Sequence, residues 1–234
     1  MATPPQAPDP AAILWVHRSL VGVRDCLGPG LRAVVWVQGC VRRCPGCIAS
    51  ELQPPSGGHP VDPRALAEDL LHRGELDGLT VSGGEPMDQP MALAALLRVF
   101  RDAGKSTWVY TGYSLEYLVG RDDPDVDRAI ALTDVLVDGD YRQDLVALPF
   151  RGSANQRLIR LSGPPLAPPA GGWGSRVEVR VDVEGSLMVV GVPPRGFLAR
   201  LQARLGARGL VVVPDQPWVE YLEPQESEIV PESR

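Results

Sequence analysis

The chain has 234 residues, of which 44% are hydrophobic and 22% charged, and its formal net charge is −6. This length suits one medium-sized domain, or a larger domain with a small appendage. The negative charge gives no support for binding to nucleic acid or to an anionic membrane, since both favour basic patches. No apolar run approaches the ~20 residues of a membrane helix, and residues 1–10 lack the pattern of an export signal. We therefore expect a cytoplasmic protein.

The first part of the chain predicts strands around a turn. Two short strands are expected at 13–16 and 20–23. A Gly-Pro-Gly turn at 28–30 then leads into a Val-rich, buried strand at 31–37. Residues 51–61 are rich in proline and glycine, so we expect a loop there.

Beyond this loop, helical and strand patterns alternate with short connections. Asp62 and Asp123 each precede a proline, which is typical of an N-cap followed by proline at the first helical position. The expected helices are 62–74, 90–104, 114–119 and 123–132, and the expected strands are 79–81, 107–110 and 135–137. This alternation favours right-handed βαβ units and a parallel sheet.

From Gly163 the composition changes, and the sequence predicts a separate C-terminal unit. Alternating valines predict a half-buried strand at 177–183, followed by a strand at 187–192, a helix around 197–205 and a strand at 210–213. The expected organisation is a disordered N-terminus (1–11), a core (12–162), a linker (163–175), a β-β-α-β appendage (176–222) and a mobile acidic tail (223–234).

Three of the four cysteines, Cys40, Cys44 and Cys47, are spaced C-x3-C-x2-C directly after the strand at 31–37. Cysteine clusters in cytosolic proteins are more often metal-binding or catalytic than disulfide-bonded. Cys26 stands apart, and we interpret it as a small buried hydrophobic residue rather than a fourth ligand. Three thiolates this close together suit a metal ion or an iron–sulfur cluster.

The missing fourth ligand separates these two kinds of site. Structural zinc usually has four ligands in two pairs, and none of His17, His59 and His72 is spaced to complete such a set. A cluster with four thiolates is a closed electron-transfer centre, whereas three thiolates leave one iron open to an external ligand. The pattern therefore favours a cluster with an open iron over zinc.

Three further motifs follow predicted strands in the same way. They are Ser82-Gly83-Gly84-Glu85-Pro86, Thr111-Gly112-Tyr113 and Asp138-Gly139. In parallel α/β folds the carboxyl ends of the strands are where ligands bind. We therefore expect the cysteines and these motifs to share one ligand-binding edge.

With its glycine-rich motif, the C-x3-C-x2-C loop resembles the radical S-adenosylmethionine superfamily. The resemblance implies an α/β fold, a partial (β/α)6-type barrel, here with the small C-terminal α+β appendage. It implies that Cys40, Cys44 and Cys47 hold a [4Fe-4S] cluster whose open iron binds S-adenosylmethionine. Reductive cleavage of that cofactor would give a 5′-deoxyadenosyl radical that abstracts hydrogen, so no general acid or base is nominated. The implied cofactor contacts are Gly46, Ile48, Ser82, Gly83, Gly84, Glu85, Thr111 and Asp138.

Within the superfamily, Gly28-Pro29-Gly30, Gln38-Gly39-Cys40 and the run from Arg151 to Arg157 resemble the activating proteins of anaerobic ribonucleotide reductase, which are glycyl-radical-enzyme activases. The sequence departs from that group at Ile48, at residues 49–51 and in its appendage. The resemblance implies a glycyl radical enzyme as protein substrate and a flavodoxin- or ferredoxin-like electron donor. The alternatives are radical modification of a peptide or small metabolite and, from another class, a non-catalytic metal or redox-sensing module.

Overall fold

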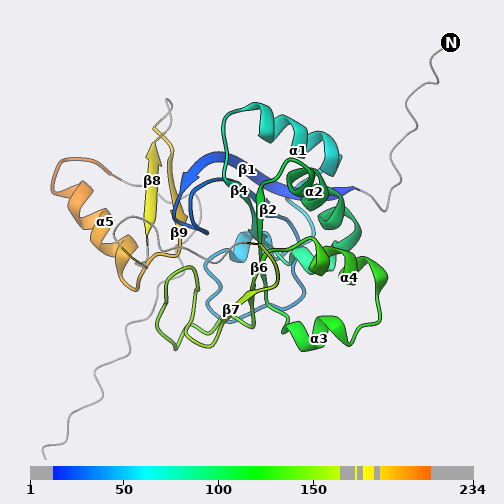
Figure 1. Cartoon of the computed structure of the whole chain (residues 1–234). Coiled ribbons are helices and arrows are strands. Elements are labelled where there is room, and N and C mark those ends of the chain that lie inside the picture. Colours follow the sequence, from blue (N-terminus) through cyan, green and yellow to red (C-terminus); the bar gives the residue numbers. More distant parts are fainter. Residues whose placement is uncertain (1–12, 164–171, 173–175, 182–184, 212–234) are drawn as a thin grey trace, which may run out of the picture.

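A computed structural model describes residues 13–163, 172, 176–181 and 185–211 of the chain (Figure 1). Its centre is a seven-stranded sheet with the strand order β3-β1-β2-β4-β5-β6-β7. The strands are β1 (Leu14–Arg24), β2 (Leu31–Val37), β3 (His59–Val61), β4 (Gly78–Gly83), β5 (Ser106–Thr111), β6 (Val135–Asp138) and β7 (Arg157–Arg160). The expected disordered N-terminus, the acidic tail and most of the linker lie outside the described residues.

The parallel sheet predicted from the sequence forms the middle of this sheet. Strands β2, β4, β5 and β6 run parallel, and β1, β3 and β7 add antiparallel strands at the two edges. The coarse expectation of a parallel-rich α/β fold is confirmed. This arrangement is compatible with a partial barrel, but the (β/α)6 repeat itself stays a prediction.

Helices α1 (Pro63–His72), α2 (Pro90–Asp102), α3 (Leu115–Val119) and α4 (Pro124–Ala131) connect the central strands, with short 3-10 turns η2 (Ser50–Leu52) and η3 (Pro86–Asp88). The predicted caps are present. Asp62 accepts hydrogen bonds from the amides of the first turn of α1, Asp123 does so for α4, and Ser114 caps α3. These side chains satisfy amide groups that have no partner inside the helix. No described helix is both long enough and apolar enough to cross a membrane.

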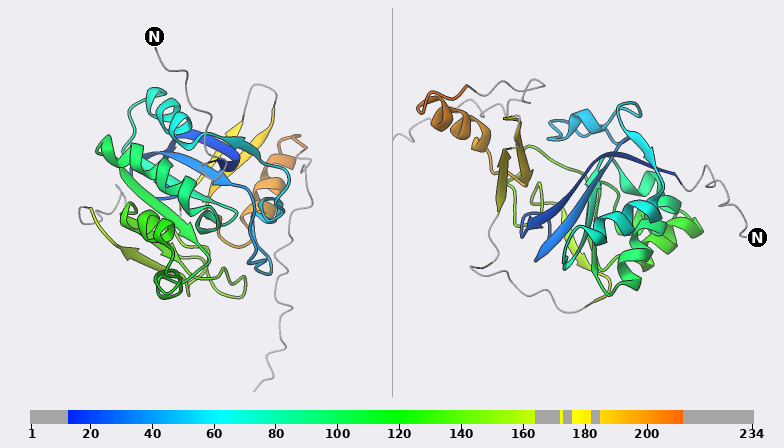
Figure 2. Two further views of the ribbon diagram at one scale, coloured as in Figure 1. Left: turned by 90° about the vertical axis from the view of Figure 1, so that its right-hand side faces the viewer. Right: turned by 90° about the horizontal axis from the view of Figure 1, so that it is seen from above.

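The two faces of the sheet are covered by different parts of the chain. Alternate residues of the central strands, such as Val35, Val81 and Val109, pack against the helices in the largest apolar cluster. The other face carries Val34 and Trp108 in two smaller clusters. Figure 2 shows the helices between residues 63 and 131 on one side of the sheet, and the C-terminal strands and helix on the other.

The C-terminal unit consists of β8 (Val177–Val181), β9 (Leu187–Gly191) and α5 (Phe197–Gly206). Strands β8 and β9 pair antiparallel with each other and, among the residues that the structure describes, with no other strand. The two strands and the helix lie where the sequence predicts them, and their organisation as a β-β-α-β appendage stays a prediction. Leu210 and Val211, at the start of the predicted last strand, are not in a strand, and residues 212 and 213 lie outside the described part.

Two local predictions were wrong, and one strand was missed. Strand β1 is continuous where two short strands were expected, because irregularities in its pairing with β2, one of them at Gly22 with φ +77°, let it bend without ending. Strand β3 lies within the expected loop at 51–61. Strand β7 was not predicted. It begins at Arg157, the last residue of the polar run, and pairing with β6 makes a strand of this short segment.

Arg32 lies fully buried on the face of the sheet away from the helices. Its guanidinium donates to Thr80 Oγ1 at 2.7 Å, to the oxygen of Leu79 at 2.6 Å and to both oxygens of Ser106. The guanidinium carbon also lies 5.7 Å from the centre of the Trp108 ring. Burial lowers the pKa of Arg32 to about 10. This side chain ties together the amino-terminal ends of three parallel strands.

Candidate functional site

The cysteine loop (residues 39–47) leaves the carboxyl end of β2 and is fixed by backbone contacts on its first residues. The amide of Gly39 donates to the oxygen of Leu52 at 2.8 Å, and the amide of Cys40 donates to the oxygen of Gln53 at 3.0 Å. Cys40, Cys44 and Cys47 are all half-buried. The loop therefore presents three partly accessible thiols beside the end of the sheet.

Gln38, the residue before this loop, binds the segment that follows the loop. Its buried side-chain amide donates to the oxygens of Glu51, Pro54 and Ser56 at 2.8–3.1 Å. Its Oε1 lies 3.1 Å from Nδ1 of His17. One side chain thus anchors residues 51–56 to β2.

The four cysteines differ in their surroundings. Burial raises the pKa of the Cys40 and Cys47 thiols, and nearby amide groups partly oppose this. Cys26 is 4% exposed in the apolar cluster under β9, and burial raises its pKa to about 11. The interpretation of Cys26 as a buried hydrophobic residue agrees with this position, which is outside the cysteine loop.

The glycine-rich motif lies directly against the start of the cysteine loop. The amide of Gly84 donates to the oxygen of Val37 at 2.7 Å, and that of Glu85 donates to the oxygen of Gly39 at 2.8 Å. A Cβ at Gly84 would fall 2.7 Å from the carbonyl carbon of Gly39. The resemblance to radical S-adenosylmethionine enzymes implied that these glycines contact the cofactor. In the structure they make room for the backbone before Cys40.

Glu85 is a fully buried carboxylate at the carboxyl ends of β4 and β5. It accepts hydrogen bonds from Thr111 Oγ1 at 2.7 Å, from the amide of Gly112 at 2.7 Å and from the amide of Met87 at 3.0 Å. Burial nevertheless raises its pKa to about 7. The structure therefore joins two of the predicted motifs through one carboxyl group.

Arg42 connects the cysteine loop to the ends of β5 and β6, and sequence reasoning did not single it out. Its Nε donates to Asp140 Oδ1 at 2.7 Å, and its guanidinium lies 4.6 Å from the centre of the Tyr113 ring. Tyr113 stacks on Tyr117 and donates to Asp88. The only sequence signal for Arg42 was a cation placed between two cysteines.

The other predicted contacts occupy the same edge in different ways. Asp138 is buried, and its carboxylate accepts hydrogen bonds from Arg157 and from the amide of Leu115. Ile48 is 44% exposed, and Gly46 has φ +67°. Ser82 lies opposite Trp36 near the end of β4. The Asp138 carboxylate therefore binds Arg157 and the first residue of α3 at this edge of the sheet.

The run from Arg151 to Arg157 closes the β6–β7 loop (residues 139–156) on itself. The buried Ser153 hydroxyl accepts from the amide of Arg142 at 3.0 Å, and Asn155 donates to the oxygen of Asp140 at 2.8 Å. Gln156 accepts from the amide of Gly152 at 2.8 Å and donates to the oxygen of Gly139 at 3.0 Å. These contacts give the run a structural role that its sequence did not reveal.

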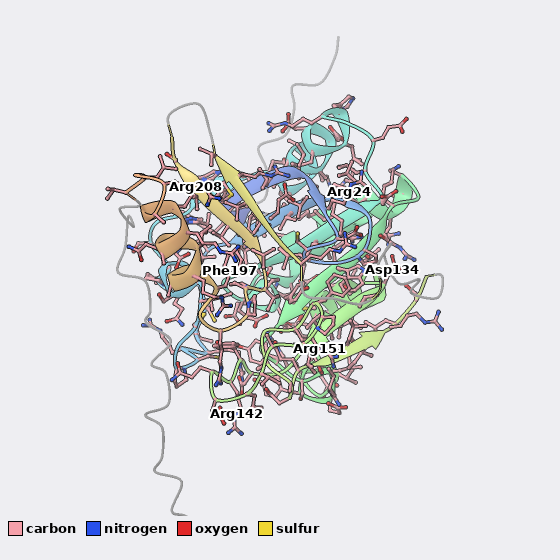
Figure 3. All side chains as sticks on the ribbon, turned by 90° about the vertical axis from the view of Figure 1, so that its left-hand side faces the viewer. Arg24, Asp134, Arg142, Arg151, Phe197 and Arg208 are labelled. Carbon is pink, nitrogen blue, oxygen red and sulfur yellow. The ribbon has the colours of Figure 1, made fainter. Side chains whose placement is uncertain are left out.

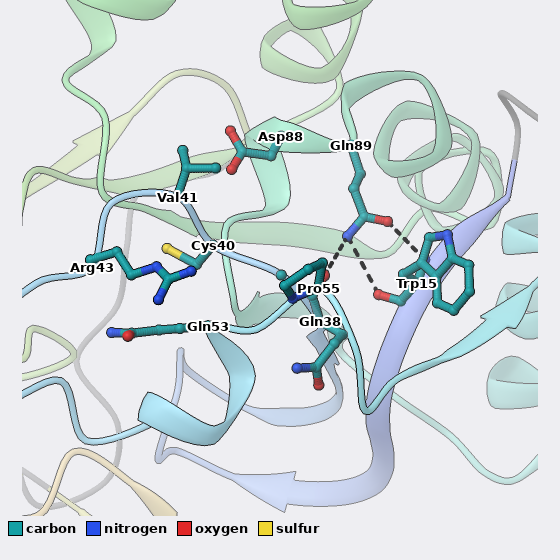
Figure 4. Close-up of a pocket in the computed structure, with 10 residues that line it drawn as sticks. Trp15, Gln38, Cys40, Val41, Arg43, Gln53, Pro55, Asp88 and Gln89 are labelled. Atoms are coloured by element: carbon teal, nitrogen blue, oxygen red, sulfur yellow. Dashed lines mark hydrogen bonds between the residues drawn. The ribbon is translucent and has the colours of Figure 1, made fainter.

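A cavity of about 510 Å³ opens beside the cysteine loop. Cys40, Val41 and Arg43 lie on one side of it, with Asp88 drawn beside Val41, and Trp15 and Gln89 lie on the other side (Figure 4). Gln89 is fixed there, because its side chain accepts from the amide of Trp15 and donates to the oxygen of Gln38. The volume of the cavity is in the range of small-molecule sites.

The donor set fits an iron–sulfur cluster better than a single ion. Within the described part of the chain, no three His, Cys, Asp or Glu side chains are gathered around one point as a single metal ion requires. A cluster binds each thiolate through a different iron, so its ligands lie further apart. Three half-buried thiols on one short loop, beside a cavity that Cys40 lines, suit such a cluster.

Comparison with known proteins gives the same result. Residues 26–159, more than half of the chain, match the family described as "4Fe-4S single cluster domain". The chain belongs to this family. The matched segment of the 4Fe-4S single cluster domain contains the cysteine loop, all four parallel strands and the β6–β7 loop, and it ends in β7. The C-terminal unit lies outside it.

Individual relatives of this 4Fe-4S single cluster domain protein are activating enzymes. The chain is 37% identical over 144 residues to the anaerobic ribonucleoside-triphosphate reductase-activating protein of Salmonella typhimurium, covering 57% of this chain and 91% of the relative. It is 30% identical over 139 residues to the protein of the same name from Enterobacteria phage T4, covering 56% and 85%. The pyruvate formate-lyase 1-activating enzyme of Escherichia coli is 28% identical over 141 residues, covering 58% and 56%.

Proposed function

We propose that this protein is a radical S-adenosylmethionine enzyme that installs a glycyl radical on a partner enzyme. The observation that carries the proposal is the placement of three thiols on one loop, against the Glu85–Thr111 cluster at the carboxyl ends of the parallel strands. The relatives, named as activating proteins of anaerobic ribonucleoside-triphosphate reductase and of pyruvate formate-lyase, support the same activity.

In this proposal Cys40, Cys44 and Cys47 hold a [4Fe-4S] cluster. When bound, the cluster and S-adenosylmethionine supply the electron transfer and the cleavage that give a 5′-deoxyadenosyl radical. The protein binds and orients the cofactor and keeps water away. The residues proposed to line the cofactor are Gly46, Ile48, Ser82, Gly83, Gly84, Glu85, Thr111 and Asp138.

Glu85 has a specific part in this arrangement. It is held by three hydrogen bonds, so its carboxyl group has one fixed orientation beside the start of the cysteine loop. A fixed carboxyl in a buried site attracts a cationic group more strongly than it would in water. We therefore assign Glu85 to the positively charged part of S-adenosylmethionine.

The decisive experiment is anaerobic reconstitution with iron and sulfide, followed by chemical reduction in the presence of S-adenosylmethionine. We expect 5′-deoxyadenosine from the native protein and none from Cys44→Ala. Cys26→Ala is the matched control, because Cys26 lies outside the loop, and it should retain cleavage. If the reconstituted native protein gives no 5′-deoxyadenosine, the proposal is wrong.

The partner is tested separately. The reduced protein is mixed with an anaerobic ribonucleotide reductase or with a pyruvate formate-lyase, and electron paramagnetic resonance is recorded. A glycyl doublet with one of them identifies the substrate class. Cleavage without a doublet in either mixture would contradict the activase assignment while leaving the cofactor chemistry intact. A reduced flavodoxin or ferredoxin should replace the chemical reductant.

A further inference from the structure

The C-terminal unit packs on the sheet through one face of its hairpin. Glu178, Arg180, Met188 and Val190 share this face by their register. Arg180 donates to the oxygens of Val21 and Gly22 at 3.0 and 2.7 Å, while Val190 is buried in the cluster that contains Val34. Figure 3 shows the two strands lying across β1 and β2, close to Arg24. The hairpin therefore covers the face of the sheet opposite the helices.

The same unit also holds the β6–β7 loop. Arg195, just before α5, donates from Nη2 to the backbone oxygens of Gln143 and Leu145. Ala147, two residues further along, packs against the apolar cluster that contains Val190 and Val192. The segment 143–147 is thus attached to the C-terminal unit by polar and apolar contacts together.

The other side of this segment touches the cysteine loop. A Cβ at Gly46 would lie 3.0 Å from the Cβ of Gln143 and still closer to the end of its side chain. Gly46 lies between Cys44 and Cys47, so Gln143 covers the part of the loop that joins two thiols. Contacts therefore run continuously from Arg195 through residues 143–145 to Gly46.

We propose that the C-terminal unit shields the iron–sulfur site by holding the β6–β7 loop over the cysteine loop, with Arg195 and Gln143 as positioning residues. The identity of the shielded group rests on the function proposed above. The contacts do not depend on it. The unit lies outside the matched family segment, so this shield is an addition to the family's core.

Thiol accessibility in the metal-free protein tests the shield directly. The probe is iodoacetamide, and the extent of modification of each cysteine is followed by mass spectrometry. Arg195→Ala should accelerate alkylation of Cys47 and Cys44 about two- to fivefold, as expected for the loss of exposed hydrogen bonds that hold a segment in place. Arg195→Lys keeps the charge and a single donor group, so it should keep part of the protection that Arg195→Ala loses. Arg204→Ala, an exposed change on α5, should have no effect.

Cys26 provides the internal reference, because it packs beneath β9. If Arg195→Ala merely loosened the whole unit, Cys26 would react faster as well. The proposal requires faster reaction of the loop thiols with Cys26 unchanged. Equal rates in Arg195→Ala and the native protein, or parallel acceleration of Cys26, would overturn it.

A second measurement uses the reconstituted protein. Loss of cluster absorbance in air should be about two- to fivefold faster in Arg195→Ala and in Gln143→Ala than in Arg204→Ala. This rate does not require cleavage of S-adenosylmethionine, so it can succeed or fail independently of the proposed enzymatic activity. Equal rates in all three variants would contradict the shield.

Discussion

Arg42 donates to the carboxylate of Asp140 from Nε, at 2.7 Å, and from Nη2, and this pair joins the cysteine loop to the end of β6. Cys44 Sγ lies 3.9 Å from the same carboxylate oxygen. The Arg42 and Asp140 side chains are 24% and 54% exposed. The pair is thus a partly solvated clamp on a loop whose backbone is fixed mainly at Gly39 and Cys40.

Removing this clamp should loosen the loop without unfolding the protein. Asp140→Ala should change the free energy of unfolding by less than about 1 kcal/mol, the usual range for an exposed ion pair. Amide hydrogen exchange at residues 41–44 and 46 should become up to about fivefold faster, since 1 kcal/mol corresponds to that factor. Asp69→Ala, which breaks the exposed pair with Arg73 on α1, is the control and should leave these amides unchanged. Unchanged exchange in Asp140→Ala would show that the ion pair does not hold the cysteine loop in place.

Glu85 should make the stability of the metal-free protein depend on pH. Its pKa is raised by burial to about 7 in the folded chain, so the folded state holds the proton more tightly than the unfolded state. The free energy of unfolding should therefore fall as the pH rises from about 4.5 through about 7, by up to about 3 kcal/mol at 1.36 kcal/mol per pKa unit.

Glu85→Gln tests this origin, because a neutral amide resembles the protonated acid. Denaturant titrations at several pH values should show the variant gaining stability relative to the native protein as the pH rises. A constant difference between the two proteins over this range would assign the pH dependence to other groups.

Gly46 and Gly104 form a matched pair for testing the contact with Gln143. Their φ angles are +67° and +69°, but a Cβ at Gly104 would have no neighbour within 4 Å. Each change to Ala should lower the free energy of unfolding by about 1–2 kcal/mol, because a side chain is strained in the left-handed backbone conformation. Only Gly46→Ala should also displace Gln143, which thiol alkylation of Cys47 would report. If both variants alkylate at the native rate, Gln143 does not cover the loop.

Arg32→Lys should be strongly destabilising although the charge is conserved. Lysine cannot reproduce the planar set of hydrogen bonds to Thr80, Leu79 and Ser106, so buried acceptors would be left without donors. We expect a loss of about 3 kcal/mol in the free energy of unfolding, measured by denaturant titration. Arg18→Lys, at an exposed position of β1, should change it by less than about 0.5 kcal/mol. A similar small change in Arg32→Lys would show that the site adapts to a flexible ammonium group.

The elements that the sequence predicts correctly carry their signals locally. Asp62 before Pro63 and Asp123 before Pro124 cap helices that begin where predicted. The valines of β2 also predict a strand without reference to any other segment. The cysteine spacing is similarly local, and it sufficed to find the loop and to favour a cluster over zinc.

The features that the sequence could not predict depend on contacts between distant segments. Strand β7 exists because it pairs with β6. Gly84 is needed because the backbone of Gly39 lies against it, and the cover over Gly46 comes from Gln143, nearly a hundred positions later. No pattern of neighbouring residues encodes such contacts, so Arg42, Gln143 and Arg195 emerged only from the structure.

Gln38 has a consequence for how the protein could survive damage. Because its side chain ties residues 51–56 to β2, the segment after the cysteines is held by the protein itself and does not rely on bound iron. Loss of the metal group to oxygen would then leave residues 51–56 in place beside the cysteine loop. Repair would need only the cysteine loop itself to close again around iron and sulfide.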